Sequence, residues 1–337
     1  MYVWTPTNGV PEARARNVLS AAQFLHSTFK DEVWLWRGQA DGTHRLEPGM
    51  HSRVLKSEHP HTNDSVSSGA EHLLDTARAA EFDRREGVRL PDLALLAVLQ
   101  HYGAATPLLD VTTDPLIALW MIAFSDGKQP DRLDGKSGRL FGILRPPRER
   151  WLEPLDARAY SDVAREAAST YFWYRAPDVT DRLAIQRGSF LLSGLNPTPS
   201  AGSNTSFFID EGMGIELDGN EDFVSRRLKN RGSRGNTAHR TSEVFAINVP
   251  GSLKAPLREL LADRSGLDVG SVYPTPWHQP FVEQFALTYR RSRPLDRDLP
   301  AKRPRVDVAS DQPPPACNCR CAFRSHQRWD FSDCISL

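Results

Sequence analysis

The 337-residue sequence predicts an α+β fold that is helix-rich in its first half and strand-rich in its second. Two patterns carry this prediction. In the first half, apolar residues recur at helical spacing over long segments, as expected of helices that bury one face. In the second half, short apolar runs alternate with turn residues, which is typical of strands.

Several segments have the spacing or the end signals of helices. Residues 11–29 carry apolar side chains near helical spacing, and residues 92–102 are nearly all Leu, Ala and Val. Asp114 followed by Pro115 combines a capping side chain with a proline at the first helical position, and so predicts a helix that starts at Pro115 and continues over 116–124. The expected helices are 11–29, 71–85, 92–102, 115–124, 156–169 and 254–262.

Strands are expected where short aromatic, β-branched or leucine-rich runs lie between turn residues. The run Val33–Trp36 is aromatic and apolar and ends abruptly at Arg37-Gly38-Gln39. The expected strands are 33–36, 106–112, 140–144, 189–192, 206–209, 214–217 and 244–249. The polar residues 56–69 and the basic, glycine-rich residues 228–240 are expected to form loops.

A change in composition divides the chain. Residues 11–290 contain all the expected elements and are predicted to form one domain. From about residue 293 the periodicity is lost, so 293–337 is predicted to be a disordered tail. All 4 cysteines lie in this tail. Cys317, Cys319 and Cys321 form C-x-C-x-C, which does not match a standard zinc site, so we expect free thiols in the tail. The main domain has no His-Glu-x-x-His or paired Cys-x-x-Cys motif and no cysteine, so we expect no zinc site and no disulfide framework there.

The charge balance limits the classes of partner. Lys+Arg and Asp+Glu number 42 each, which argues against attraction of the whole surface to nucleic acid or anionic membrane. The basic stretch Arg226–Arg240 could still contact nucleic-acid phosphates, although most such loops are only solvated. No run approaches the roughly 18 apolar residues that span a bilayer, and the N-terminal residues do not resemble a signal peptide. We therefore expect a cytoplasmic protein without a membrane partner.

Three segments carry the most specific signals in the sequence. They are Trp34–Gln39 (WLWRGQ) continued by Leu46–Met50 and Arg53, then Leu99–Leu119 with LQHYG and TPLLDVTTDPLIAL, and then Arg182–Phe190 (RLAIQRGSF). In this order they resemble the FRG domain, a bacterial family. A weaker echo at Gly266–Pro274 extends the resemblance to about residue 285. Trp36, Pro107 and Val111 depart from the residues that are usual in the family.

The motif order in turn resembles that of ADP-ribosyltransferases, in which a strand ending in Arg precedes a Ser/Thr-rich strand and a later strand carrying Glu. Here Arg37, Thr112–Pro115 and Gln186–Gly188 take those places. This second resemblance is one of fold, and it implies a single ADP-ribosyltransferase-like domain. The sequence departs from the pattern at Gly188, where the transferases carry Glu.

The motif residues have side chains suited to binding a nucleotide. The guanidinium of Arg37 could hold a phosphate, or it could form a salt bridge with Glu47. Gly38 would let a ligand approach closely. His101 could move a proton or bind a ribose hydroxyl, or it could only cap the helix dipole.

The remaining motif residues border apolar segments. A carboxylate that closes an apolar run needs a partner, which for Asp110 is either a ligand or Arg37. Free N–H groups after Thr112-Thr113 could hold a phosphate at the helix start. Gln186 could hydrogen-bond a base or a ribose. The resemblance implies catalytic roles for Arg37, His101, Asp110 and Gln186, and NAD binding by Arg37, Gly38, Gln39, Thr112, Thr113 and Gly188.

Taken further, the resemblance implies an enzyme that cleaves NAD and transfers ADP-ribose to a protein or nucleic-acid acceptor. In bacteria such proteins often serve as toxins or phage-defence effectors. Because Gly188 replaces Glu, a non-catalytic nucleotide- or nucleic-acid-binding module stays open. If the protein is an enzyme, another carboxylate must take that place. The candidates are Asp110, inside the strongest motif, and Glu243, at the start of an expected strand, and we favour Asp110.

Overall fold

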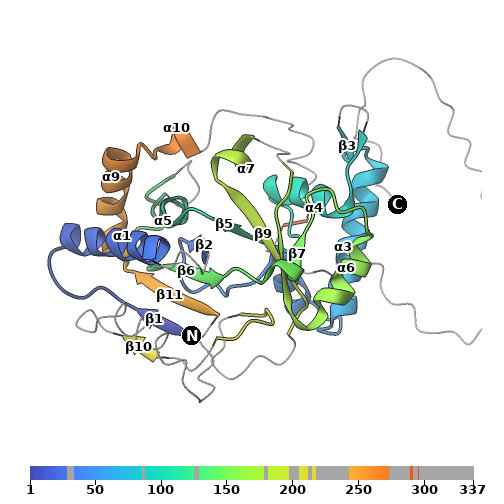
Figure 1. The fold of residues 1–337 in the computed structure, drawn as a ribbon, viewed down its shortest axis with the longest axis horizontal. Coiled ribbons are helices and arrows are strands. Elements are labelled where there is room, and N and C mark those ends of the chain that lie inside the picture. Colours follow the sequence, from blue (N-terminus) through green and yellow to red (C-terminus); the bar gives the residue numbers. More distant parts are fainter. Residues whose placement is uncertain are drawn as a thin grey trace, which may run out of the picture. The chain divides into compact units, whose positions relative to one another are not determined.

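The computed structural model describes residues 1–28, 34–85, 88–124, 129–177, 181–196, 205–211, 215–217, 243–272, 289–290 and 295. All of them lie within Met1–Pro300, which forms one compact unit. The described elements are a large sheet with helices packed on it (Figure 1).

The sheet consists of nine strands among the described residues, in the order β10-β1-β11-β6-β2-β5-β9-β8-β7. Their bounds are β1 Tyr2–Trp4, β2 Trp34–Gln39, β5 Leu108–Thr112, β6 Gly138–Leu144, β7 Trp151–Leu152, β8 Tyr171–Tyr174, β9 Gly188–Ser193, β10 Ile215–Leu217 and β11 Val244–Val249. The neighbours from β11 to β8 pair antiparallel. Parallel pairs occur only towards the two edges of this sheet. This mixed architecture confirms the α+β prediction, although strands come from both halves of the chain.

Two groups of helices cover one face of the sheet. Helices α1 (Pro11–Thr28), α5 (Pro115–Ala123) and α9 (Lys254–Ser265) contribute to an apolar cluster with Trp34 and Trp36 of β2. Helices α3 (Asn63–Ala79), α4 (Asp92–His101) and α6 (Tyr160–Glu166) contribute to a second cluster, with Leu108 of β5. Trp36 pairs with Thr112, which shares a strand face with Leu108, so both clusters lie on the same face. Shorter elements are α2 Gly49–Leu55, α7 Asp181–Ile185, α10 Val269–Val272, and the small hairpin of β3 Arg84–Arg85 and β4 Val88–Arg89.

The sheet is strongly curled. The Tyr171 hydroxyl of β8 donates a hydrogen bond to the Leu144 carbonyl of β6 at 3.0 Å. Four strand spacings separate these strands, which in a flat sheet is about 19 Å. The face opposite the helices is therefore concave, and it is filled by a third apolar cluster that includes Leu35, Val111 and Leu191.

The local helix signals give the right start for α5, whereas two expectations are wrong. Helix α5 begins at Pro115, and the Asp114 carboxylate accepts the Leu116 N–H at 2.9 Å, as predicted. The expected loop 56–69 instead contains the start of α3, capped by Thr62, because buried Val66 and Gly69 already belong to its apolar face. The expected strand 206–209 is absent from the described strands, and its neighbour Thr205 forms only an isolated bridge with Leu46.

One residue of the expected tail packs into the main unit. Leu295 is 1% exposed and belongs to a small apolar cluster with Met50, Val54, Val66 and Leu195. The prediction of disorder from residue 293 is therefore wrong for Leu295. The other residues of 293–337, with the C-x-C-x-C segment, lie outside the described residues, as does the expected loop 228–240.

Candidate functional site

The three sequence motifs place their strands side by side. Strand β2 carries the first motif, β5 the second and β9 the third, and they are neighbours in the sheet. Trp36 lies opposite Thr112, and Thr112 lies opposite Gly188. Trp36 of the first motif and Gly188 of the third, more than a hundred positions apart in the sequence, thus lie in one row of paired residues across the sheet.

The pairing between β2 and β5 breaks at this level. Only Trp36 and Thr112 are in register between these strands, whereas β5 and β9 pair over five positions. Beyond the break, Arg37 Nη1 donates a hydrogen bond to the Asp110 carbonyl oxygen at 2.8 Å and lies 3.4 Å from Asp110 Oδ2. The structure therefore pairs Arg37 with Asp110. Glu47, the other expected partner, contacts Arg45 and Ser52.

Asp110 is open to solvent although it lies on a central strand. Its side chain is 59% exposed, whereas the other four residues of β5 are buried. Asp110 therefore has the partner Arg37, one of the two that the sequence suggested, although its side chain is exposed. Its face of the sheet is the one covered by the two helix groups, since Asp110 alternates with Leu108. Solvent thus reaches the helix-covered face of the sheet at Asp110.

A backbone network connects the second and third motifs beside Asp110. Thr112 Oγ1 donates to the Gln186 carbonyl at 2.7 Å and accepts the Asp114 N–H at 3.1 Å. The Thr113 N–H donates to the Arg187 carbonyl at 3.3 Å. The two threonines therefore hold the turn before β9 against the start of α5.

Arg187 is a site residue that the sequence motifs did not single out. Its backbone has φ +46°, in the left-handed region that disfavours residues with a Cβ. Its side chain is 68% exposed and lies 3.3 Å from the Asp114 carboxylate. Strained conformations of this kind concentrate at functional sites. The only signal in the sequence was the position of Arg187 between Gln186 and Gly188, because an arginine gives no indication of a positive φ.

The glycines and amides of the motifs are engaged with the protein itself. A Cβ on Gly38 would lie 1.9 Å from the Ala118 carbonyl oxygen, so the close approach at Gly38 is that of helix α5 and not of a ligand. A Cβ on Gly188 would lie 2.5 Å from Leu183 Cδ1. The Gln39 amide donates to the Arg45 carbonyl at 3.2 Å, and the Gln186 amide donates to the Val272 carbonyl of α10 at 3.2 Å.

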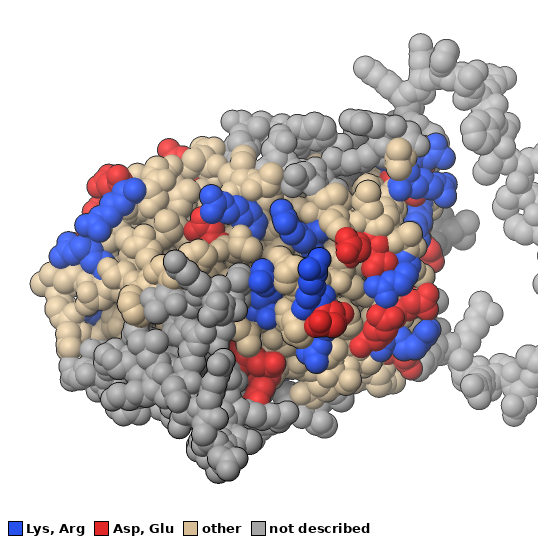
Figure 2. Space-filling view, in the orientation of Figure 1, with Lys and Arg blue, Asp and Glu red and all other residues tan. Residues whose placement is uncertain are grey.

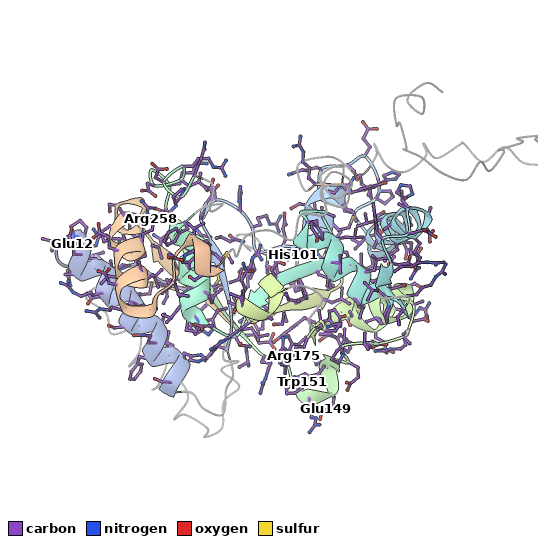
Figure 3. All side chains as sticks on the ribbon, turned by 90° about the horizontal axis from the view of Figure 1, so that it is seen from above. Glu12, His101, Glu149, Trp151, Arg175 and Arg258 are labelled. Atoms are coloured by element: carbon purple, nitrogen blue, oxygen red, sulfur yellow. The ribbon has the colours of Figure 1, made fainter. Side chains whose placement is uncertain are left out.

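His101 and Glu243 stand apart from this network in different ways. His101, labelled in Figure 3, ends α4. Its ring packs edge-on against Tyr102 with centroids 5.3 Å apart. The catalytic role that the resemblance implies for His101 stays a prediction. The Glu243 N–H donates to the Asp210 carbonyl, and the Glu243 carboxylate accepts the Asp210 N–H. The Glu243 carbonyl accepts the Leu144 N–H. Because Leu144 contacts Tyr171, which pairs with Ser193, Glu243 lies towards the end of β9 opposite Gly188.

The site thus combines an exposed carboxylate, two guanidinium groups and two hydroxyl side chains. The carboxylate of Asp110 can stabilise positive charge on a bound ligand, and the exposed Arg187 can reach an anionic group. The sequence suggested that free N–H groups at the start of α5 could hold a phosphate. The Leu116 N–H is not free for this, because it donates to the Asp114 carboxylate. Within the described ranges, no three His, Cys, Asp or Glu side chains come together as metal ligands.

Comparisons with known proteins support the first part of the resemblance. Residues 32–132 match the FRG domain family, a range that includes Arg37, His101, Asp110 and the start of α5. Gln186 and the third motif lie outside the match. No curated protein matches the sequence, and no solved structure matches it. No helix in the described part of the chain is long and apolar enough to cross a bilayer.

Proposed function

We propose that the site around Asp110 binds NAD and cleaves its nicotinamide–ribose bond, transferring ADP-ribose to an acceptor. The observation that carries this proposal is a solvent-exposed carboxylate on a central strand, beside Arg37 and at the junction of all three motif strands. Besides its contact with Arg37, the Asp110 side chain is 59% exposed and therefore accessible to a ligand. This exposure supports a ligand site, as does the backbone strain at Arg187.

The reaction requires little covalent chemistry from the protein. The C1′–N bond breaks with its electron pair leaving on nicotinamide, an oxygen of the acceptor bonds to C1′, and the acceptor releases one proton. Positive charge develops on the ribose ring in between, and a fixed carboxylate stabilises it. In this assignment Asp110 supplies the carboxylate, and Arg37 fixes the segment of β5 that carries Asp110. Arg187 binds a phosphate of NAD, and Thr112 with Thr113 shapes the wall of the cleft.

Two observations favour a second function, that of a nucleotide-binding module without turnover. Leu183 fills the space beside Gly188, where the transferases carry their catalytic Glu. A glutamate at this position would require Leu183 to move. The Gln186 amide is likewise bound to Val272 instead of facing a ligand. A protein that retained the cleft and lost the catalytic acid would have these features.

Two measurements on the purified full chain separate the alternatives. Calorimetric titration with NAD reports binding, and chromatographic detection of free nicotinamide reports cleavage. We expect both binding and slow nicotinamide release, because water can serve as acceptor when no macromolecule is present. Binding without release indicates the nucleotide-binding module. Absence of both results contradicts the proposal.

A further inference from the structure

An exposed tryptophan and several arginines form a cluster at the edge of the sheet formed by β7 and β8. Trp151 of β7 pairs with Trp173 of β8, and the two rings meet edge-on with centroids 4.9 Å apart. The Arg145 guanidinium lies 4.6 Å from the Trp151 ring centroid and 5.4 Å from that of Trp173. Trp151 nevertheless remains 36% exposed, which is unusual for so large an apolar side chain.

This aromatic group is held in place before any partner binds. The Trp151 indole N–H donates to the Pro146 carbonyl at 2.8 Å. Pro146-Pro147 restricts the backbone of the segment that joins β6 to β7, and the short 3-10 helix Arg148–Arg150 follows it. A ligand therefore meets a flat ring whose orientation is already fixed, which lowers the entropy cost of binding.

The surroundings of Trp151 are positively charged. The segment 145–151 carries three arginines and one glutamate, and Arg175 follows β8 directly. Arg148 and Arg175 are exposed. On the face shown in Figure 2, Lys and Arg side chains lie over the link between β6 and β7, with some Asp and Glu side chains beside them. In Figure 3, Trp151, Arg175 and Glu149 lie together on one side of the molecule.

This cluster is separate from the site at Asp110. Trp173 belongs to the apolar cluster on the concave face of the sheet, whereas Asp110 alternates with Leu108 on the face covered by helices. By contrast, two exposed arginines elsewhere, Arg165 and Arg84, are paired with nearby carboxylates. Arg165 lies 3.2 Å from Asp162, and Arg84 lies 3.8 Å from Glu81.

We propose that the edge formed by Arg145, Arg148, Trp151 and Arg175 binds single-stranded nucleic acid. A fixed, exposed indole ring can stack on an unpaired base of any sequence, and arginines beside it can neutralise the backbone phosphates. In a duplex the bases are already stacked on one another, so Trp151 offers nothing to a double strand. An acidic peptide would satisfy the arginines and leave the aromatic ring unused.

Fluorescence anisotropy tests the proposal with labelled oligo(dT) and oligo(U) of about 12 nucleotides, within the usual site size of such grooves. The full chain is used without NAD, so the result is independent of any NAD cleavage. We expect Trp151→Ala to weaken binding by about 5- to 100-fold, the usual loss for one stacking contact, and Trp151→Phe to retain most of it. The double variant Arg148→Glu with Arg175→Glu should reduce the slope of log K against log salt concentration by about 1.4 in magnitude, since each phosphate contact in a single strand contributes about 0.7 to that slope.

The matched control reverses two exposed arginines away from the edge, Arg84→Glu with Arg165→Glu, and should leave affinity nearly unchanged. Circular dichroism and the melting temperature verify that each variant is folded. The proposal is overturned if wild-type protein binds neither oligonucleotide, or if the folded tryptophan and arginine variants bind as wild type does. Equal competition by a duplex or by poly-glutamate would also overturn it, because it would reduce the site to non-specific electrostatics or to a site for acidic peptides.

Discussion

The substitution Asp110→Asn tests the proposed chemistry with little change to the fold. Asparagine keeps the size of the side chain and removes only its charge. If Asp110 stabilises the charged ribose in the transition state, nicotinamide release should fall by a factor on the order of 100 or more, the usual loss for one preorganised electrostatic contact. Binding of NAD in the ground state should change much less.

The structure indicates that the stability cost is small. The main hydrogen bond from Arg37 goes to the Asp110 backbone carbonyl at 2.8 Å, and asparagine retains that acceptor. The lost carboxylate contact is longer, at 3.4 Å, and the Asp110 side chain is 59% exposed. Exposed ion pairs contribute about 0–1 kcal/mol, which for a unit of this size is a melting shift of at most about 4 °C.

A matched control separates a catalytic effect from the loss of a surface ion pair. Asp162 is 54% exposed and pairs with Arg165 at 3.2 Å, so Asp162→Asn removes a comparable charge far from the motifs. We expect this control to retain both stability and nicotinamide release. Full turnover in a folded Asp110→Asn protein would remove Asp110 from the mechanism. A loss of turnover that only accompanies unfolding would show that the reasoning about stability is wrong.

Three further predictions concern packing and protonation. Gly38→Ala should lower the free energy of unfolding by about 3 kcal/mol or more, since the new Cβ meets the Ala118 carbonyl, whereas Gly135→Ala, with open space around its Cβ, should be nearly neutral in chemical denaturation. Leu295→Ala should cost about 2–5 kcal/mol, and a chain ending at residue 300 should keep its melting temperature within a few degrees; an unaffected Leu295→Ala protein would argue against the packing of Leu295. Complete burial lowers the pKa of His51 to about 3. Between about pH 6.5 and pH 3 the histidine is therefore protonated in the unfolded chain and neutral in the folded chain. As the pH falls through this range, the free energy of unfolding should decrease by up to about 1.4 kcal/mol per pH unit. His51→Asn should flatten this slope, while the exposed His61→Asn should leave it unchanged.

Features set by neighbouring residues could be predicted from the sequence. Asp114-Pro115 gave the start of α5 because an N-cap and its proline act within one turn. The motif residues Arg37, Thr112 and Gln186 were found as polar groups bordering apolar strands. The missed start of α3 shows the limit of such signals, because residues 63–69 are mostly polar and only Val66 and Gly69 among them are buried.

Long-range pairing decided what those residues do. The sequence does not reveal that β2 and β5 are in register only at Trp36 and Thr112, that the Asp110 carbonyl accepts from Arg37, or that the Asp110 side chain is exposed. Nor does it reveal that helix α5 occupies the space beside Gly38, that the Gln186 amide turns to Val272, or that Arg187 takes a left-handed conformation. The physical reason is that a local motif determines only which polar groups are present within a few residues of the chain. The partner of each group depends on strand register and helix packing, which the whole chain determines together.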